Sequence, residues 1–254
     1  MPLEICKEMS LCTVMLLGRQ PQILIHAQAE TRLHRGGHAY ARDNAIRLGA
    51  QPDRIHLLQA APGHSSPGYQ HIVNTEQTGE HWTAADGIIL EQTNSAAFFQ
   101  TADCPSVIMC NKRAGIVGLV HCGRPAGEPV DGRNIITKLL DLIATNDQDI
   151  DQLEVYITGA IAGIDFKHDD NDSIRAKALP YLDEFGADVF ADVDTLALDM
   201  VKVITWQLMA AGLDETQITH DGLNTYRGPG LASHRRSANE QELRVTANTV
   251  LVVT

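Results

Sequence analysis

Apolar residues are arranged along the chain in two patterns, which predict alternating strands and helices. Consecutive apolar residues favour strands that are covered on both faces, and they occur at 105–111, 114–122 and 153–163. Apolar residues at helical spacing predict helices at 40–55, 131–146 and 192–214. Shorter apolar segments predict strands at 21–28, 55–60, 85–90, 96–101, 217–226 and 242–254. Glycine, proline and serine predict loops at 61–72 and 227–241.

Strands that alternate with helices are typical of a layered α/β or α+β domain. We expect one such domain over residues 1–254, with a mixed β-sheet flanked by helices. Residues 1–20 are interpreted either as an element of that domain or as an N-terminal extension upstream of Met15, because Glu4 and Glu8 do not suit a signal peptide. No apolar run reaches the ~20 residues needed to cross a bilayer, so no membrane association is expected.

The two central apolar runs are joined by a tight turn at 111–115, which predicts a β-hairpin with Cys104 and His121 at its open end. A thiolate facing an imidazole has two common uses in proteins. The two groups can ligate zinc or copper, or they can act as a nucleophile and its base. A buried cysteine can equally be a small apolar residue, so spacing alone leaves the question open.

A catalytic metal centre needs a third protein ligand, and the loop at 61–72 offers two histidines, His64 and His71. Two acidic residues are candidates to orient a ligating histidine through its second ring nitrogen: Asp103, which precedes Cys104, and Asp86. An aspartate in such a turn can also bond only to its own backbone.

The net charge of −12, from 32 acidic and 20 basic residues, argues against nucleic-acid binding. A local anion site remains compatible with this charge, because paired guanidinium groups grip phosphate or carboxylate. The candidates for such a site are Arg124, Arg227, Arg235 and Arg236. Five cysteines without a CxxC motif fit a reducing compartment, so we expect a cytoplasmic protein.

Six segments, in order along the chain, resemble motifs of the YfiH-like laccase-domain proteins, which are regarded as purine nucleoside-processing enzymes. These segments are "RDNAIRLGAQPDRIHLLQ", "ADGIIL", "QTADCPSVIMCN", "IVGLVHCGRPAG", "ITGAIAG" and "NTY" followed by "SHRR". The segment around Cys104 is the most specific match. The chain departs from the family pattern at four points: the histidine motif that follows Gln59 is broken, the tryptophan after Gly123 is missing, and Asn224 and Ala160 replace the family's cysteine and proline. It is therefore identified as a divergent member.

The resemblance implies a YfiH-like fold and a zinc ion, with copper as the alternative, held by two histidines and one cysteine. Cys104 and His121 match two of these ligands directly, and His71 is favoured over His64 as the third. The implied reaction is phosphorolysis of adenosine or inosine, with adenosine deamination in some members. Purine nucleoside and phosphate are then the small-molecule partners, with Arg124, Arg235 and Arg236 as phosphate-binding candidates and Asp103 beside the metal. We expect a monomer or a weak homodimer.

Two other functions remain open on the same residues. In the first, Cys104 and His121 form a metal-free hydrolase or deamidase. In the second, the divergent motifs leave a non-catalytic nucleotide-binding protein. A true laccase is disfavoured, because it needs several copper sites and the chain contains no HxH cluster.

Overall fold

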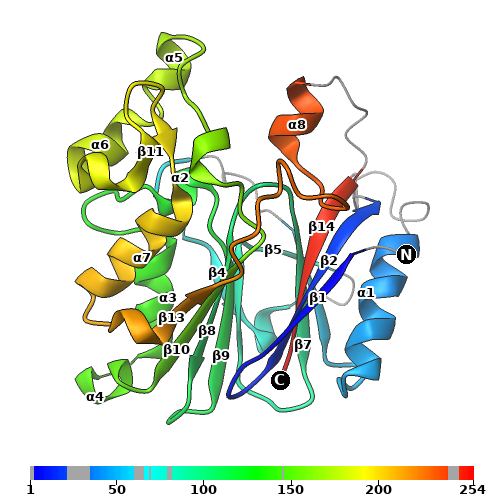
Figure 1. Ribbon diagram of the computed structural model, residues 1–254. Helices are drawn as coiled ribbons and strands as arrows, with labels where there is room; N and C mark the ends of the chain where they lie inside the picture. The colour runs from blue at the N-terminus through cyan, green and yellow to red at the C-terminus, as the bar shows by residue number, and fades with distance from the viewer. Residues whose placement is uncertain are drawn as a thin grey trace.

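Two six-stranded mixed sheets pack face to face at the centre of the protein (Figure 1). The computed structural model describes residues 3–21, 35–59, 66–68, 70–78, 82–144, 146–239 and 246–254. The first sheet, sheet A, has the order β1 (Glu4–Glu8), β2 (Thr13–Pro21), β14 (Thr246–Val253), β7 (Ala96–Thr101), β3 (Ile55–Gln59) and β5 (Thr83–Ala84). The second, sheet B, has the order β13 (Ile218–His220), β10 (Leu153–Thr158), β8 (Ser106–Asn111), β9 (Ile116–His121), β6 (Gly87–Leu90) and β4 (Ile72–Asn74).

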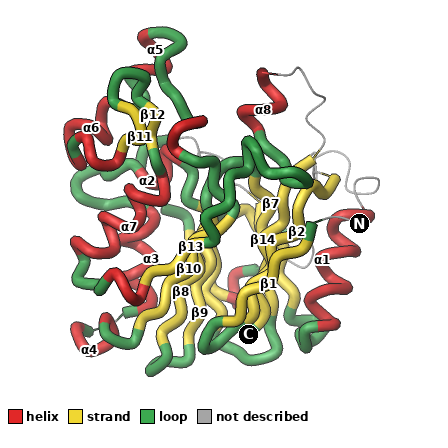
Figure 2. The backbone as a smooth tube through the Cα atoms, in the orientation of Figure 1, coloured by secondary structure: helices red, strands yellow, loops and turns green. Residues whose placement is uncertain are grey.

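Helices cover the outer faces of the two sheets, so the strands lie in the middle and the helices on the flanks (Figure 2). Helix α1 packs on sheet A, and α3 and α7 pack on sheet B. The helices are α1 (Arg35–Arg47), α2 (Arg124–Gly127), α3 (Ile135–Ile143), α4 (Asp147–Ile150), α5 (Asp172–Arg175), α6 (Leu179–Phe185), α7 (Met200–Ala210) and α8 (His234–Asn239). A small hairpin of β11 (Phe190–Asp192) and β12 (Ala197–Leu198) precedes α7.

The apolar runs in the sequence are explained by three separate hydrophobic layers. Successive side chains of a strand point to opposite faces. On β8, Val107 and Met109 therefore face the helices, whereas Ile108 and Cys110 face sheet A. Both faces of sheet B are thus buried, which is why its strands read as continuous apolar segments.

The predicted hairpin is confirmed: β8 and β9 pair antiparallel, with Ser106 opposite His121. A glycine in β9 sets how closely α3 can lie on this hairpin. A Cβ atom at Gly118 would stand 2.5 Å from the side chains of Leu139 and Ile143. Glycine therefore allows an approach that any larger residue would block.

The α/β fold class is confirmed, but three predicted details change. Two mixed sheets are present where one was expected. The helix predicted at 192–214 begins only at Met200, because Asp199 caps it by accepting hydrogen bonds from two backbone N–H groups and the preceding segment forms the β11–β12 hairpin. The loop predicted at 227–241 contains α8.

The N-terminal residues 4–8 and 13–21 are strands of sheet A, and β2 pairs with the long strand β14. Most of the strand predicted at 21–28 lies outside the described residues. No helix in the described part of the chain has the length and apolar character needed to cross a membrane.

Candidate active site

The ends of three neighbouring strands of sheet B bring Cys104, His121 and Asp86 together. His121 ends β9, and its backbone N–H donates to the Asp86 carbonyl at 2.7 Å. Its Nδ1 lies 3.3 Å from Asp86 Oδ1, and its ring stacks on Phe99 with centroids 4.7 Å apart. Cys104 precedes β8 and also hydrogen-bonds the imidazole. The prediction that the hairpin places Cys104 beside His121 therefore agrees with the structure.

Negative neighbours dominate the electrostatics of His121. Burial disfavours a charged imidazole, but the charge of Cys104 and hydrogen bonds with Asp86 and Cys104 outweigh burial and raise the pKa of His121 to about 10. The Asp86 side chain is 1% exposed, and its Oδ2 finds no hydrogen-bond partner among the described residues. These surroundings favour positive charge at the His121 ring, whether a proton or a metal ion supplies it.

Asp103 occupies a different place from the one predicted for it. Its φ is +80°, its Oδ1 accepts a 2.6 Å hydrogen bond from Thr225 Oγ1, and its Oδ2 accepts a 2.7 Å hydrogen bond from the backbone N–H of Arg235. The acid that orients His121 is therefore Asp86. Asp103 instead ties the segment before β8 to the start of α8, because both of its oxygens are engaged there.

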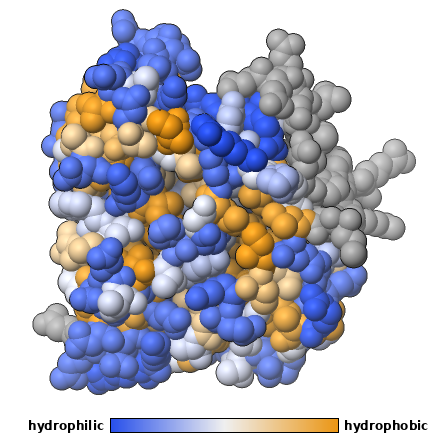
Figure 3. All heavy atoms as spheres, viewed as in Figure 1, coloured by the Kyte–Doolittle hydropathy of each residue, from blue (hydrophilic) through white to orange (hydrophobic). Residues whose placement is uncertain are grey.

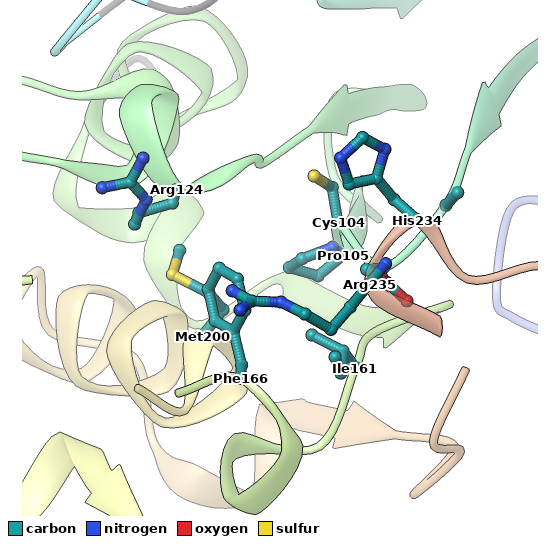
Figure 4. A pocket seen from close by; sticks show the side chains of 10 residues that line it. Cys104, Pro105, Arg124, Ile161, Phe166, Met200, His234 and Arg235 are labelled. Carbon is teal, nitrogen blue, oxygen red and sulfur yellow. The ribbon is translucent and has the colours of Figure 1, made fainter. Parts of the chain in front are cut away.

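A cavity of about 260 Å³ opens next to Cys104 (Figure 4). One wall is apolar, with Phe166 and Met200, and the polar side chains around it include Arg124, His234 and Arg235. Arg124 comes from α2 and Arg235 from α8, so the cavity lies between segments that are far apart in the sequence. The surface beside α8 is strongly hydrophilic (Figure 3).

The two arginines of the cavity are held in different ways. Arg124 donates from Nη1 to the Lys177 carbonyl at 2.9 Å, and burial lowers the pKa of its guanidinium. The Arg235 guanidinium lies 5.4 Å from the centroid of the Phe166 ring. It also pairs with the exposed carboxylate of Asp170, but at 3.9 Å, which is long for an ion pair. Such a loose, solvent-exposed ion pair is weak, so the Arg235 guanidinium remains available to a ligand.

The other two arginine candidates do not line this cavity. Arg236 donates to the backbone carbonyls of Tyr226, at 2.8 Å, and Leu231, so it holds the loop before α8. Arg227 makes a two-pronged ion pair with Asp165, at 2.7 and 2.6 Å. Adjacent arginines thus have different roles: Arg235 lines the cavity, whereas Arg236 stabilises the loop before α8.

The described residues supply only part of a metal centre. A zinc ion with an open position needs three protein ligands, and Cys104 and His121 are two suitable ones. Among the described residues, no three His, Cys, Asp or Glu side chains gather closely enough to hold a metal ion. His71 is exposed directly before β4, and its carbonyl accepts the Asp86 N–H at 2.9 Å, whereas His64 lies outside the described residues.

Several residues of the cavity were not found from the sequence, among them His234, Phe166 and Met200. His234 stands in the "SHRR" segment and signals itself only by adjoining the arginines. Phe166 and Met200 carry no recognisable motif. Phe166 follows the helical turn 163–165, with its carbonyl accepting the Leu198 N–H at 3.1 Å, and Met200 begins α7, so tertiary packing brings both to the cavity. A pattern of apolar residues cannot distinguish such a wall from ordinary core.

Comparison with known proteins shows the family to which the chain belongs. A family model described as "Multi-copper polyphenol oxidoreductase laccase" matches residues 43–247. The chain belongs to this family. Within it, the purine nucleoside phosphorylases of Mycobacterium bovis and Mycobacterium tuberculosis are 27% identical to the chain over 155 residues. That stretch covers 60% of the chain and 57% of the relatives' own length.

Solved structures of the family share the fold. The Bacillus licheniformis hypothetical protein YfiH superimposes with a TM-score of 0.72 at 16% identity, covering 95% of this chain and 92% of that one. YlmD from Geobacillus stearothermophilus also gives a TM-score of 0.72, at 17% identity, with 96% and 92% covered. At such low identities the likeness concerns the fold alone, and it confirms the expected YfiH-like architecture.

Proposed function

We propose that the protein is a purine nucleoside phosphorylase, which converts adenosine or inosine and phosphate into the free base and ribose 1-phosphate. The observation that carries the proposal is the cavity beside Cys104 and His121, which combines two arginines with an apolar wall. Such a cavity suits a ligand that is part anion and part flat apolar ring. Membership of a family whose mycobacterial relatives are named purine nucleoside phosphorylases supports the same reaction.

The residues of the cavity have separate tasks in this reaction. The net charge of −12 repels phosphate at long range, so a guanidinium inside the cavity has to attract it, and we assign this task to Arg124. Phe166 and Met200 cover the purine ring and exclude water from it. A phosphate oxygen then forms the bond to C1′ of the ribose, the C1′–N9 bond breaks, and its electron pair leaves with the base, which takes up a proton.

Cys104 and His121 are proposed to hold a zinc or copper ion, with His71 or His64 as the third ligand. The hydrogen bond between Asp86 and Nδ1 leaves the Nε2 atom of His121 for such an ion. Metal analysis of the purified protein tests this part. Cys104→Ser should lose the metal, and comparing His71→Ala with His64→Ala should identify the third ligand. Equal metal content in wild type and Cys104→Ser would refute the assignment.

The reaction is tested by incubating the metal-replete protein with inosine or adenosine, with and without phosphate. We expect free base and ribose 1-phosphate only when phosphate is present. Inosine formed from adenosine in the absence of phosphate would reveal deaminase activity as well. Absence of turnover with every purine nucleoside would refute the proposal.

A second candidate function is a metal-free cysteine hydrolase or deamidase. The arrangement of Cys104, His121 and Asp86 favours it, because a thiol, an imidazole and an orienting carboxylate are the parts of an activated nucleophile. Metal-free protein whose Cys104 reacts rapidly with iodoacetamide would support this function. Stoichiometric metal bound through Cys104 would exclude it.

A further inference from the structure

The polar side chains around the cavity are dominated by hydrogen-bond donors. The guanidinium groups of Arg124 and Arg235 carry N–H donors and no acceptor. Asp103 is the one carboxylate among the described residues that line the cavity. Both of its oxygens already accept hydrogen bonds, from Thr225 Oγ1 at 2.6 Å and from the Arg235 backbone N–H at 2.7 Å. A ligand therefore meets donors on this side of the cavity.

Arg235 is the arginine that lies against the apolar wall. Its guanidinium stands 5.4 Å from the centroid of Phe166, and Figure 4 shows its side chain extending toward Phe166 and Met200. Asp103 accepts a hydrogen bond from the Arg235 backbone N–H, and within the described part of the chain the Arg235 guanidinium pairs with Asp170, at 3.9 Å. Arg124 reaches the cavity from α2 and is anchored to the Lys177 carbonyl. A base seated beside Phe166 and Met200 can turn its edge to the Arg235 guanidinium, which leaves Arg124 for the phosphate.

The two classes of purine differ at the edge that such an arginine would contact. A 6-oxopurine presents two acceptors, O6 and N7, whereas a 6-aminopurine presents the N7 acceptor and the N6 amino donor. An arginine pairs with O6 and N7 through two parallel hydrogen bonds. Against a 6-aminopurine, donor would face donor, and one of the two groups would lose its hydrogen-bond partner.

We propose that the site prefers 6-oxopurine nucleosides, the class of inosine and guanosine, over 6-aminopurine nucleosides, and that Arg235 determines this preference by reading O6 and N7. The inference rests on the proposed phosphorylase function and deepens it. Arg235 acts here as a specificity-determining residue. His234 also lines the cavity, and an imidazole offers both a donor and an acceptor, so its contribution is tested separately.

The test measures kcat/KM for phosphorolysis of inosine, adenosine and purine riboside, which has no substituent at C6. Chromatography should separate hypoxanthine, adenine and purine, so that any deamination of adenosine is counted apart from phosphorolysis. We expect the wild type to favour inosine over adenosine roughly tenfold to hundredfold, the range that one two-bond base contact gives. Purine riboside should fall below inosine, because it lacks O6.

Arg235→Gln is the decisive variant, because a glutamine amide offers a donor and an acceptor and pairs with N6 and N7 of adenine. The ratio of inosine to adenosine should fall at least tenfold in this variant and stay unchanged in the matched control Arg113→Gln. Arg113 lies in the turn after β8, at the opposite end of the hairpin from Cys104. If Arg235→Gln loses all turnover, the ratio of the affinities for hypoxanthine and adenine, measured by calorimetry, replaces the ratio of kcat/KM values.

Three results would overturn the preference. The first is wild-type adenosine turnover equal to or above that of inosine, and the second is a ratio that Arg235→Gln leaves unchanged. The third is a ratio that collapses in His234→Phe while Arg235→Gln retains it. Failure of the phosphorylase function itself is recognised separately, because no purine nucleoside would then be turned over by the wild type.

Discussion

The buried His168 makes a sharp prediction about how stability depends on pH. Its side chain is almost fully buried, with Nδ1 3.1 Å from the Leu196 carbonyl and its ring edge-on to Phe166 at 4.6 Å between centroids. Burial, with the positive charges of Arg124 and Arg235 adding to it, lowers the pKa of His168 to about 4. The folded protein therefore keeps this histidine neutral where an unfolded chain would protonate it.

The sign and size of the effect follow from that difference. An unfolded histidine has a pKa of about 6.5, so between about pH 6.5 and 4 the unfolded state binds the extra proton and stability falls as the pH falls. Between pH 7.5 and pH 5.8, protonation of His168 in the unfolded state raises the equilibrium constant of unfolding by a factor of about six, which corresponds to about 1 kcal/mol. The full effect, below about pH 4, is about 3 kcal/mol.

The assay compares wild type with His168→Asn, whose amide can still donate to the Leu196 carbonyl. Urea unfolding at pH 7.5 and pH 5.8 stays above the isoelectric point of about 5.3. The wild type should lose about 1 kcal/mol more than the variant between these two pH values, whatever fixed cost the substitution adds. Equal losses, or a His168 ring that titrates near pH 6.5 by NMR in the folded protein, would refute the reasoning.

Three further predictions concern the candidate site and the loop beside it. Asp86→Asn removes the charge that orients His121, and we expect kcat/KM for phosphorolysis to fall about 10- to 100-fold. The midpoint of urea unfolding should stay the same, which shows that the variant is folded. An unchanged kcat/KM would show that Asp86 plays no part. Arg236→Met should lower the free energy of unfolding by about 1–3 kcal/mol, because it leaves partly buried carbonyls unpaired, without changing KM for phosphate. Arg124→Met should instead raise KM for phosphate, and the opposite assignment of these two effects would contradict the structure.

The pairing of Cys104 with His121 could be predicted because it depends on local information. Two apolar runs around a tight turn define a hairpin, and the period of two along each strand defines which residues meet at its open end. The role of Asp86 needed more, since Asp86 joins the site only through the pairing of β6 with β9. The sequence offered both Asp86 and Asp103, and Asp103 was placed in the predicted site because it adjoins Cys104. Only the order of strands shows that Asp86 is the acid beside His121.

The two adjacent arginines show a second limit of sequence reasoning. Arg235 and Arg236 are identical in type and were both predicted to bind phosphate. Successive side chains on an α-helix point about 100° apart, so once the segment becomes α8 only one of them can face the cavity. The helix was not predicted, because glycine, proline and polar residues favour a loop at 227–241.

The helix predicted at 192–214 fails at its start for a comparable reason. Leu196, Ala197 and Leu198 are apolar and continue the pattern of α7 toward the N-terminus. Asp199 nevertheless caps the helix, and Leu196 has a φ of +46°, which no helix residue adopts. The apolar residues before the cap are buried by the small β11–β12 hairpin, so apolar periodicity alone places the boundary too early.

The position of β14 has a consequence for the order in which the two sheets can fold during translation. This strand joins β2 to β7 inside sheet A, and it ends at Val253. Sheet B is built entirely from residues 72–220, so it can assemble on the ribosome while the rest of the chain is still being translated. Sheet A has no continuous centre until β14 is released from the exit tunnel, and α8 with Arg235 directly precedes that strand. Nascent chains should therefore carry a folded half with Cys104 and His121 in place, and acquire a complete cavity only once α8 and β14 have left the exit tunnel.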